Sequence, residues 1–387
     1  MAETPKICVF TGSRADYGLL RGLLRELQQR DALRLLVSGM HLSAAFGMTR
    51  NEILADGFAI DAEVDMELAG DDPAAIAKAL GRGVIGMTDA LQAMAPDVLV
   101  ILGDRYEALA AAQVALLLSI PIAHIHGGEI TEGALDDAIR HAISKMATLH
   151  FPAAEPYRRR LIQMGEDPAR VHDVGALGIQ NTDAYTRIDR AAFSAKTGFS
   201  FGPLNILATC HPVTATGSDP EAGIAALCAA LDRIGDCRIL FTAANADAGG
   251  RRINAFIEAY AKTRPQRAQM VASLGSELYA AALGLFDLVV GNSSSGLIEA
   301  PAAGTPTVNI GDRQKGRLRA PSVIDCAEDA AAIEQAIRSA LTPEHRRIAE
   351  ARQSPYGRGA TARLIAEALL QFRWREAGAK RFHDLQI

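Results

Sequence analysis

The chain has 387 residues and a formal net charge of −5, and this acidic balance excludes a general affinity for nucleic acid. Hydrophobic residues make up 49% and charged residues 22% of the sequence, which is typical of a globular protein and excludes a largely disordered chain. The length exceeds one ordinary core, so we expect two domains.

Short apolar runs alternate with longer helical patterns in the first half of the chain, which predicts parallel β/α winding. The expected strands are Ile7–Phe10, Leu35–Val37, Val98–Leu102 and Ile120–Ile125, and the expected helices are Leu19–Gln29, Ala74–Ala93 and Tyr106–Leu118. Each of these helices is long enough to cross back over a parallel sheet.

The second half repeats this pattern, with strands expected at Ile206–Thr209, Arg238–Phe241, Leu288–Val290 and Thr307–Ile310. A polar segment from about Asn181 to Pro203 interrupts the alternation and is expected to be a linker. After Ile324 the pattern is largely helical. The predicted fold class is therefore α/β, with two doubly wound Rossmann-like domains at about 1–185 and 200–363.

Neither the amino terminus nor the cysteines indicate secretion. Glu3 and Lys6 precede a short apolar run, unlike a signal peptide. The most apolar window, Ala108 to Ile125, contains Pro121 and His124, so helix, turn and strand are expected rather than a membrane span. The five cysteines lack a CxxC or zinc-ligand spacing, so neither disulfides nor a structural metal is expected. We expect a cytoplasmic protein without membrane association.

The segment Phe286–Glu299 joins an apolar strand to a helix through small residues that include Ser293, Ser294 and Ser295. Unpaired amides at a helix start favour an anion, so we interpret it as a phosphate cradle. Glu299 follows about one and a half turns into the helix, where its carboxylate could accept hydrogen bonds from a ribose diol. A serine-capped helix with a surface glutamate is the alternative that needs no ligand.

Polar residues also follow the first and central strands of the first half. Arg14 follows the first strand and could clamp a phosphate, unless it merely pairs with Asp16. Asp104 ends the apolar strand Val98–Leu102, where a carboxylate is either a helix cap or a catalytic group.

Carboxylates and imidazoles gather after the next strand, in His124–Glu129 and in Asp136-Asp137 followed by Arg140-His141. Crowded carboxylates raise one another's proton affinity, which suits an acid or base near neutral pH. We expect His124 and His126 to point to opposite faces of a strand, so no metal site is expected.

Further donors follow strands of the second half: His211, Asn245 and Arg313. A structural histidine and a solvated basic loop are the alternatives that need no ligand. The chain has no GxSxG elbow, which argues against a serine nucleophile. It also lacks GxGxxG after the first strand, which argues against a nicotinamide cofactor, and no cofactor is expected.

Several motifs occur in an order that resembles the hydrolysing UDP-N-acetylglucosamine 2-epimerases over almost the whole chain. They are Gly12-Ser13-Arg14-Ala15-Asp16-Tyr17, Gly103-Asp104-Arg105, His124-Ile125-His126-Gly127-Gly128-Glu129, Asp136-Asp137-Ala138-Ile139-Arg140-His141, His211-Pro212-Val213-Thr214, Gly291-Asn292-Ser293-Ser294-Ser295-Gly296 and Gly311-Asp312-Arg313-Gln314. The resemblance implies the GT-B architecture, with a ligand cleft between its two domains and a C-terminal helix, at about 364–387, that packs back on the first domain. It also implies a homodimer or homotetramer.

The resemblance implies a UDP-sugar as substrate, with UDP held mainly by the second domain. The substrate-binding residues would be Arg14, Gly18, Arg105, His211, Asn245, Ser273, Leu274, Gly275, Ser293, Ser294, Ser295, Glu299 and Arg313. The catalytic candidates are Asp104, Glu129, Asp136, Asp137, His126 and His211. Some related epimerases carry a glutamate where this chain has His126, so either His126 or Glu129 would fill that role.

The implied reaction eliminates UDP across C1 and C2 of the sugar and then adds water with inversion at C2. UDP-N-acetylglucosamine, giving N-acetylmannosamine for sialic-type acids, is the expected substrate, and UDP-N,N'-diacetylbacillosamine, for legionaminic acid, is the alternative. A GT-B glycosyltransferase and a non-catalytic UDP-sugar sensor are more distant alternatives.

Overall fold

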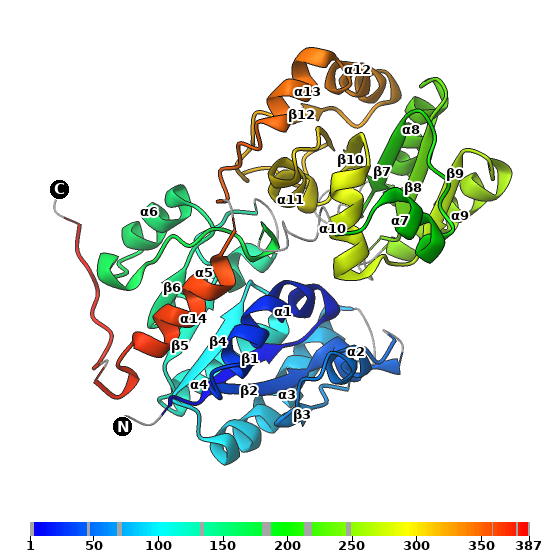
Figure 1. The fold of residues 1–387 in the computed structure, drawn as a ribbon. Helices are drawn as coiled ribbons and strands as arrows, with labels where there is room; N and C mark the ends of the chain where they lie inside the picture. The colour runs from blue at the N-terminus through cyan, green and yellow to red at the C-terminus, as the bar shows by residue number, and fades with distance from the viewer. Residues whose placement is uncertain are drawn as a thin grey trace. The chain divides into compact units, whose positions relative to one another are not determined.

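A computed structural model describes residues 4–44, 47–67, 72–131, 135–179, 187–212, 219–244, 249–357, 359–376 and 378–385, and Figure 1 shows its ribbon. The chain forms two compact units. The first contains the chain up to Ile130, residues 135 to 177, and the chain from Ala360 onward, whereas the second contains Gly178–Gly359.

The first unit is built on a parallel sheet of six strands. They are β1 (Ile7–Thr11), β2 (Leu33–Ser38), β3 (Ala62–Val64), β4 (Val98–Leu102), β5 (Ile122–Ile125) and β6 (Leu149–Phe151), in the order β3-β2-β1-β4-β5-β6. Ile7 of β1 pairs with Leu33 on one side and Val98 on the other. The strand order therefore reverses direction between β1 and β4, the switch point where ligands bind in open α/β sheets.

Helices cover both faces of this sheet. They are α1 (Arg14–Gln28), α2 (Arg50–Ala55), α3 (Pro73–Met94), α4 (Tyr106–Leu117), α5 (Leu135–Met146), α6 (Glu155–Gln163) and α14 (Thr361–Gln371), with short 3₁₀ turns η1 (Gly39–Leu42), η3 (Pro168–Arg170) and η5 (Trp374–Glu376). Figure 1 shows α14, in red, beside α1, and Leu24 and Ile365 share one buried core. Met87 and Val114 belong to the core on the other face.

The second unit repeats this topology. Its strands are β7 (Asn205–Thr209), β8 (Arg238–Thr242), β9 (Ala268–Val271), β10 (Leu288–Gly291), β11 (Thr307–Ile310) and β12 (Val323–Cys326), in the order β12-β11-β10-β7-β8-β9. Its helices are α7 (Arg190–Thr197), α8 (Pro220–Asp232), α9 (Gly250–Thr263), α10 (Gly275–Leu285), α11 (Ser295–Ala303), α12 (Ala330–Ala340) and α13 (Pro343–Glu350). Starting from β9, the order matches that of the first sheet, and the switch point lies between β7 and β10.

The predicted pair of doubly wound sheets is confirmed, but details of the second half differ from expectation. The segment expected to be a linker contains α7, because Phe193 is fully buried against Phe201 and Phe286 in a core of the second unit. The chain after Ile324 was expected to be largely helical, and α12, α13 and α14 agree with this. The expectation missed the half-exposed strand β12, which includes Ile324 and pairs with β11.

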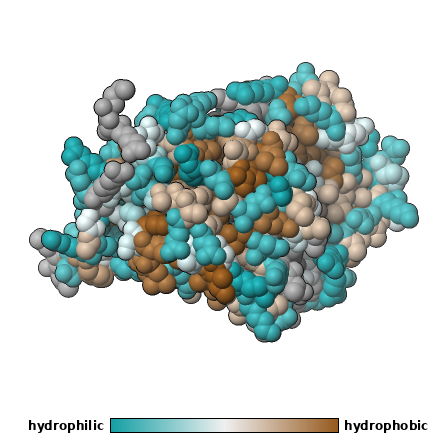
Figure 2. Space-filling model, turned by 90° about the horizontal axis from the view of Figure 1, so that it is seen from below, coloured by the Kyte–Doolittle hydropathy of each residue, from teal (hydrophilic) through white to brown (hydrophobic). Residues whose placement is uncertain are grey.

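Some helices of the first unit carry apolar side chains on their outer side. Ile85 of α3 is 70% exposed, and Leu117 of α4 is 80% exposed. The view from below in Figure 2 shows apolar patches within a mostly hydrophilic surface. Among the described helices, none combines the length and hydrophobicity that a membrane span requires.

Candidate active site

The residues predicted for catalysis in the first unit surround Arg140 of α5, whose side chain is only 2% exposed. Its Nη2 forms an ion pair with Asp104, which follows β4. Its Nη1 donates to the Glu129 carbonyl at 3.0 Å and lies 3.5 Å from Asp137 Oδ1. A buried guanidinium needs compensating negative charge, and Asp104 lies where it can supply that charge. Asp104 retains 21% side-chain exposure and can still meet a substrate.

His126 and Glu129 form a second pair on the loop after β5. His126 Nδ1 lies 3.2 Å from Glu129 Oε1, and Glu129 is 2% exposed. His126 Nε2 accepts from the Leu177 amide at 3.3 Å, which places the ring proton on Nδ1, toward the carboxylate. The contact brings the ring and the carboxylate together at an ion-pair distance without hydrogen-bond geometry.

The expectation that His124 and His126 point to opposite faces of one strand is wrong. Residues two apart on a strand share a face, and β5 ends at Ile125, so His126 does not lie on the strand. His126 has a φ of +62°, a left-handed conformation that is uncommon for a residue with a side chain. The turn therefore carries His126 off the strand and toward Glu129. Such conformations cluster at functional sites, because the surrounding structure must hold them in place.

His124 lies on β5, near the carboxyl end of the strand, where it is fully buried and makes two hydrogen bonds. Its Nε2 lies 2.7 Å from the Gly103 carbonyl, and its Nδ1 lies 3.0 Å from Ser144 Oγ. Because a carbonyl can only accept, Nε2 carries the proton and Nδ1 accepts from the Ser144 hydroxyl. Burial lowers the pKa of His124 to about 3, so the ring is neutral at physiological pH.

The two aspartates on the first turn of α5 differ in their surroundings. Asp136 is exposed, whereas Asp137 is half-buried beside Arg140 and lies 3.6 Å from His141 Nε2. Burial lowers the pKa of His141, although Asp137 opposes that shift. Asp137 therefore belongs to the cluster around Arg140.

The remaining residues predicted in the first unit lie in α1 and at the start of α4. Arg14 Nε pairs with Glu52 at 3.2 Å and not with Asp16, which instead accepts from the Gly12 amide. A Cβ added at Gly18 would meet no atom within 4 Å, so packing does not require glycine there.

Arg105 pairs with a carboxylate that is buried beneath it. Its Nε lies 3.3 Å from Oε2 of Glu107, whose side chain is fully buried. Burial lowers the pKa of Arg105, but Glu107 and Asp16 outweigh that effect and raise it. The guanidinium therefore compensates a buried charge in addition to any contact with a ligand.

In the second unit, Asn292 ties together the loops after three strands. It accepts from the His211 amide at 2.7 Å and donates to the His211 carbonyl at 2.8 Å. Its own carbonyl accepts from Arg313 at 3.1 Å and Gln314 at 2.9 Å. Burial, with help from Arg313, lowers the pKa of His211 to about 3. A neutral His211 therefore adds no charge to this edge.

The predicted phosphate cradle lies between β10 and α11. Ser293 and Ser294 are half-buried, and no described residue accepts a hydrogen bond from either backbone N–H. Gly291 precedes them with a φ of +141°, and a Cβ there would lie 1.8 Å from the Thr209 carbonyl oxygen. Two open amides at a helix start, reached through a glycine that no other residue can replace, are suited to an anion.

Glu299 and Ser295 lie on α11, beyond the cradle. Ser295 Oγ accepts from Tyr279 at 2.9 Å, and burial raises the pKa of half-buried Glu299, although Ser295 opposes this. A Cβ at Gly178 would lie 2.9 Å from Glu299 Cγ, so that backbone packs directly on the carboxylate side chain.

Ser273, Leu274 and Gly275 lead into α10, which carries Tyr279. Ser273 Oγ accepts from the Gly275 amide at 3.1 Å, and Leu274 is the residue before the helix. Asn245, which was predicted to contact the substrate, lies outside the described residues. Within the described ranges, no three histidine, cysteine or acidic side chains are placed to hold a metal ion.

Sequence reasoning missed the roles of Arg140 and Tyr279. Arg140 was quoted within a motif, but its burial against Asp104, Asp137 and the Glu129 carbonyl is not visible in a sequence. Tyr279 lies in an ordinary apolar helical pattern that gives no signal. Asn292 was also quoted in a motif, and its position between glycine and three serines is the one signal that marked its loop.

Comparison with known proteins gives three findings. A sequence profile described as UDP-N-acetylglucosamine 2-epimerase matches residues 25–370. The GDP/UDP-N,N'-diacetylbacillosamine 2-epimerase (hydrolyzing) of Campylobacter jejuni is 39% identical over 83% of this chain and 84% of its own. The UDP-N,N'-diacetylbacillosamine 2-epimerase (hydrolyzing) of Legionella pneumophila is 38% identical over 87% and 89%.

A solved structure, UDP-GlcNAc 2-epimerase from Neisseria meningitidis bound to UDP-GlcNAc, matches with a TM-score of 0.79 and 16% identity, covering 95% of this chain and 99% of that one. At that identity the likeness shows the fold alone, and it confirms the predicted GT-B class with its two Rossmann-like domains.

Proposed function

The chain belongs to the UDP-N-acetylglucosamine 2-epimerase family and is a hydrolysing UDP-sugar 2-epimerase, and we propose that its substrate is UDP-N,N'-diacetylbacillosamine. The observation that carries this choice is that the relatives from Campylobacter and Legionella are both named for that sugar and cover most of the chain. This reverses the preference drawn from the sequence, which placed UDP-N-acetylglucosamine first.

The second unit binds UDP in this proposal. The open amides of Ser293 and Ser294 receive the diphosphate, supported by the positive end of the α11 dipole. The Glu299 carboxylate accepts hydrogen bonds from the ribose hydroxyls. Arg313, held by the Asn292 carbonyl, adds positive charge for the departing UDP.

The first unit supplies the proton chemistry. Asp104, paired with Arg140, removes the C2 proton while the bond between C1 and the UDP oxygen breaks, which gives a 2-acetamidoglycal and UDP. Water then adds its hydroxyl to C1, and a proton reaches C2 from the opposite face. The pair of His126 and Glu129 delivers that proton. The remaining proton of the water replaces the one delivered to C2, and Asp104 releases its proton to solvent. Asp137, on the other side of Arg140, holds the guanidinium in place.

The test is to incubate the pure protein separately with UDP-N,N'-diacetylbacillosamine and with UDP-N-acetylglucosamine, without an acceptor, and to follow free UDP. We expect release from both, with the higher kcat/KM for the diacetamido sugar. A preference for UDP-N-acetylglucosamine would contradict the substrate assignment. No release from either sugar would favour a glycosyltransferase or a sensor and would contradict the reaction itself.

UDP-N-acetylglucosamine remains the second candidate, because the family profile bears its name. The two sugars differ by an acetamido group in place of the C4 hydroxyl and by a methyl group in place of the C6 hydroxymethyl. A pocket that accepts the C6 methyl through apolar contacts discriminates only about 10–200-fold, so activity on both sugars is expected.

A further inference from the structure

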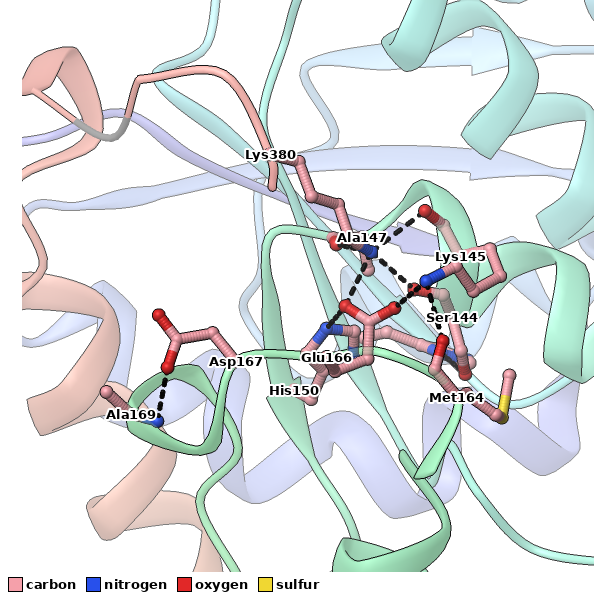
Figure 3. A network of polar contacts seen from close by, with 10 residues as sticks. Ser144, Lys145, Ala147, His150, Met164, Glu166, Asp167, Ala169 and Lys380 are labelled. Carbon is pink, nitrogen blue, oxygen red and sulfur yellow. Dashed lines mark hydrogen bonds and ion pairs between the residues drawn. The ribbon is translucent and has the colours of Figure 1, made fainter. Parts of the chain in front are cut away.

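The C-terminal tail, residues 378–385, lies against the first unit and is fixed by Lys380 (Figure 3). Lys380 Nζ donates to the carbonyls of Ser144, Lys145 and Ala147 at 3.2, 2.8 and 2.7 Å. It also lies 2.6 Å from Glu166 Oε2. One ammonium group from the far end of the chain therefore binds the last turn of α5.

The carbonyls of Lys145 and Ala147 need a partner, because the end of any helix leaves its carbonyl groups without an intrahelical donor. The Ser144 carbonyl also accepts from the Ala147 amide at 3.2 Å, so Lys380 is its second donor. A lysine there satisfies them and interacts favourably with the negative end of the helix dipole. Removing Lys380 would leave three acceptors and the carboxylate of Glu166 without this ammonium group, so the last turn of α5 should fray.

Glu166 holds Lys380 in position from the other side. Its carboxylate is 2% exposed and also contacts His150 Nε2 at 2.8 Å and Lys145 Nζ at 2.6 Å. Burial alone would raise the pKa of Glu166, but the hydrogen bonds from these partners outweigh it and lower the pKa to about 2. The carboxylate is therefore fully ionised and keeps the tail in place.

The last turn of α5 also carries Ser144, which contacts the catalytic edge. Its hydroxyl donates to His124 Nδ1, and His124 Nε2 donates to the Gly103 carbonyl, directly before Asp104. Arg140, one turn earlier on α5, forms the ion pair with Asp104. The position of α5 along its axis therefore sets both contacts that hold Asp104.

We propose that Lys380 is a positioning residue for the reaction: it fixes the end of α5 and so, through Ser144 and His124, sets the backbone that presents Asp104. This inference rests on the proposed function of Asp104 as the base. Lys380 itself touches no reacting atom and acts only through the helix.

The test combines single and double variants in the full-length protein. Lys380→Met and Ser144→Ala should each lower kcat about 10-fold with little change in KM, and Lys380→Arg should restore much of the loss. Because both variants break the same chain of contacts, the double variant should be no slower than the worse single one. Independent, multiplicative losses would overturn the proposal.

Lys145→Met is the matched control. Lys145 lies on the same last turn of α5 and pairs with Glu166, but its Nζ donates to the Met164 carbonyl and not to the carbonyls at the end of α5. This variant should leave kcat within about 2-fold. A loss equal to that of Lys380→Met would show that only the charge balance of Glu166 matters and would overturn the proposal.

A readout without substrate separates this proposal from the proposed function. Nitrogen-15 NMR of the histidine rings should show His124 as the Nε2–H tautomer in the wild type and a mixture of tautomers in Lys380→Met. An unchanged His124 spectrum would overturn the proposal even if the enzyme is active. A changed spectrum in a protein that releases no UDP would instead count against the function.

Discussion

The two sheets share one strand order, yet their switch points carry opposite chemistry. Beside the first switch point, the loops after β4 and β5 present carboxylates and an imidazole near the buried guanidinium of Arg140. At the second switch point, the loops after β7 and β10 present open main-chain amides and serine hydroxyls, and Asn292 joins these loops by hydrogen bonds to the His211 backbone. The comparison shows that topology decides where a ligand site lies, whereas the loop residues decide what it does.

The two switch points also differ in the interactions that hold their site residues in place. The first uses buried ion pairs, so removing one partner leaves a charge uncompensated. The second relies largely on backbone geometry, with Gly291 closing on Thr209. Changes in the first unit should therefore alter turnover, and changes in the second should alter UDP binding or stability.

The largest effect is expected for Asp104→Asn. Loss of the base should lower kcat about 10²–10⁴-fold, while calorimetry should find an unchanged affinity for UDP. Asp97→Asn is the matched control, because Asp97 precedes the opposite end of β4 and accepts from the Lys6 amide. Wild-type turnover in Asp104→Asn would show that Asp104, beside the first switch point, does not act as the base.

Glu129→Gln should behave like Asp104→Asn in its effect on turnover, because the amide cannot exchange a proton with His126. Its kcat should fall by about 10²-fold or more, again with unchanged affinity for UDP. A Glu129→Gln variant that loses UDP affinity instead would mean that the two edges do not divide the work as described.

Gly291→Ala should mainly destabilise the second unit. The added Cβ would collide with the Thr209 carbonyl, and we expect the free energy of unfolding to fall by about 3 kcal/mol. Urea unfolding checks this, with Gly18→Ala as control. Gly18 lies in α1 with open space around it, so alanine there should be neutral or slightly stabilising. Unchanged stability in Gly291→Ala would refute the steric argument.

A smaller effect is expected for Glu299→Gln, which should raise KM about 10-fold and leave kcat nearly unchanged. Burial raises the pKa of Glu299, so this carboxylate takes up a proton at a higher pH than an exposed glutamate does. As the pH is lowered, the affinity of the wild type for UDP should therefore begin to weaken at that higher pH. Titration calorimetry at several pH values measures this, and exposed Glu277 offers a control for the substitution. A pH-independent affinity would exclude a ribose contact by the carboxylate.

The smallest effect concerns stability in acid. The pKa values of His124 and His211 lie near 3 in the folded protein, against about 6.5 in an unfolded chain. As the pH falls from 6.5 toward 3, only the unfolded chain gains protons at these rings, so the free energy of unfolding should decrease. Replacing His211 with glutamine should flatten this dependence in urea titrations. An unchanged slope would argue that the ring protonates in the folded state.

The sequence predicted those elements whose residues are uniformly apolar. Strand β4 was predicted with its observed bounds because all five of its residues are buried, whereas the half-exposed strands β9 and β12 gave no such pattern. The short strands β3 and β6, of three residues each, were missed as well. Helix α7 was also missed, because the polar composition of its segment did not reveal that its Phe193 is buried among other aromatic residues of the second unit.

Within the candidate site, the sequence indicated which loops carry polar groups but not how those groups pair. The partners of Asp104, Arg14 and Arg105 depend on side-chain burial and on helix positions that only the folded chain supplies. The contact between the C-terminal tail and α5 joins residues more than 230 positions apart and left no sequence signal.

The division of labour between the two switch points is tested most directly by running the reaction in D₂O and locating deuterium in the released sugar by NMR. If the carboxylates of the first unit remove and replace the C2 proton while the second unit holds UDP, one deuteron should appear at C2, and Asp104→Asn should slow its appearance as much as it slows turnover. A released sugar that carries no deuterium at C2 would contradict the account.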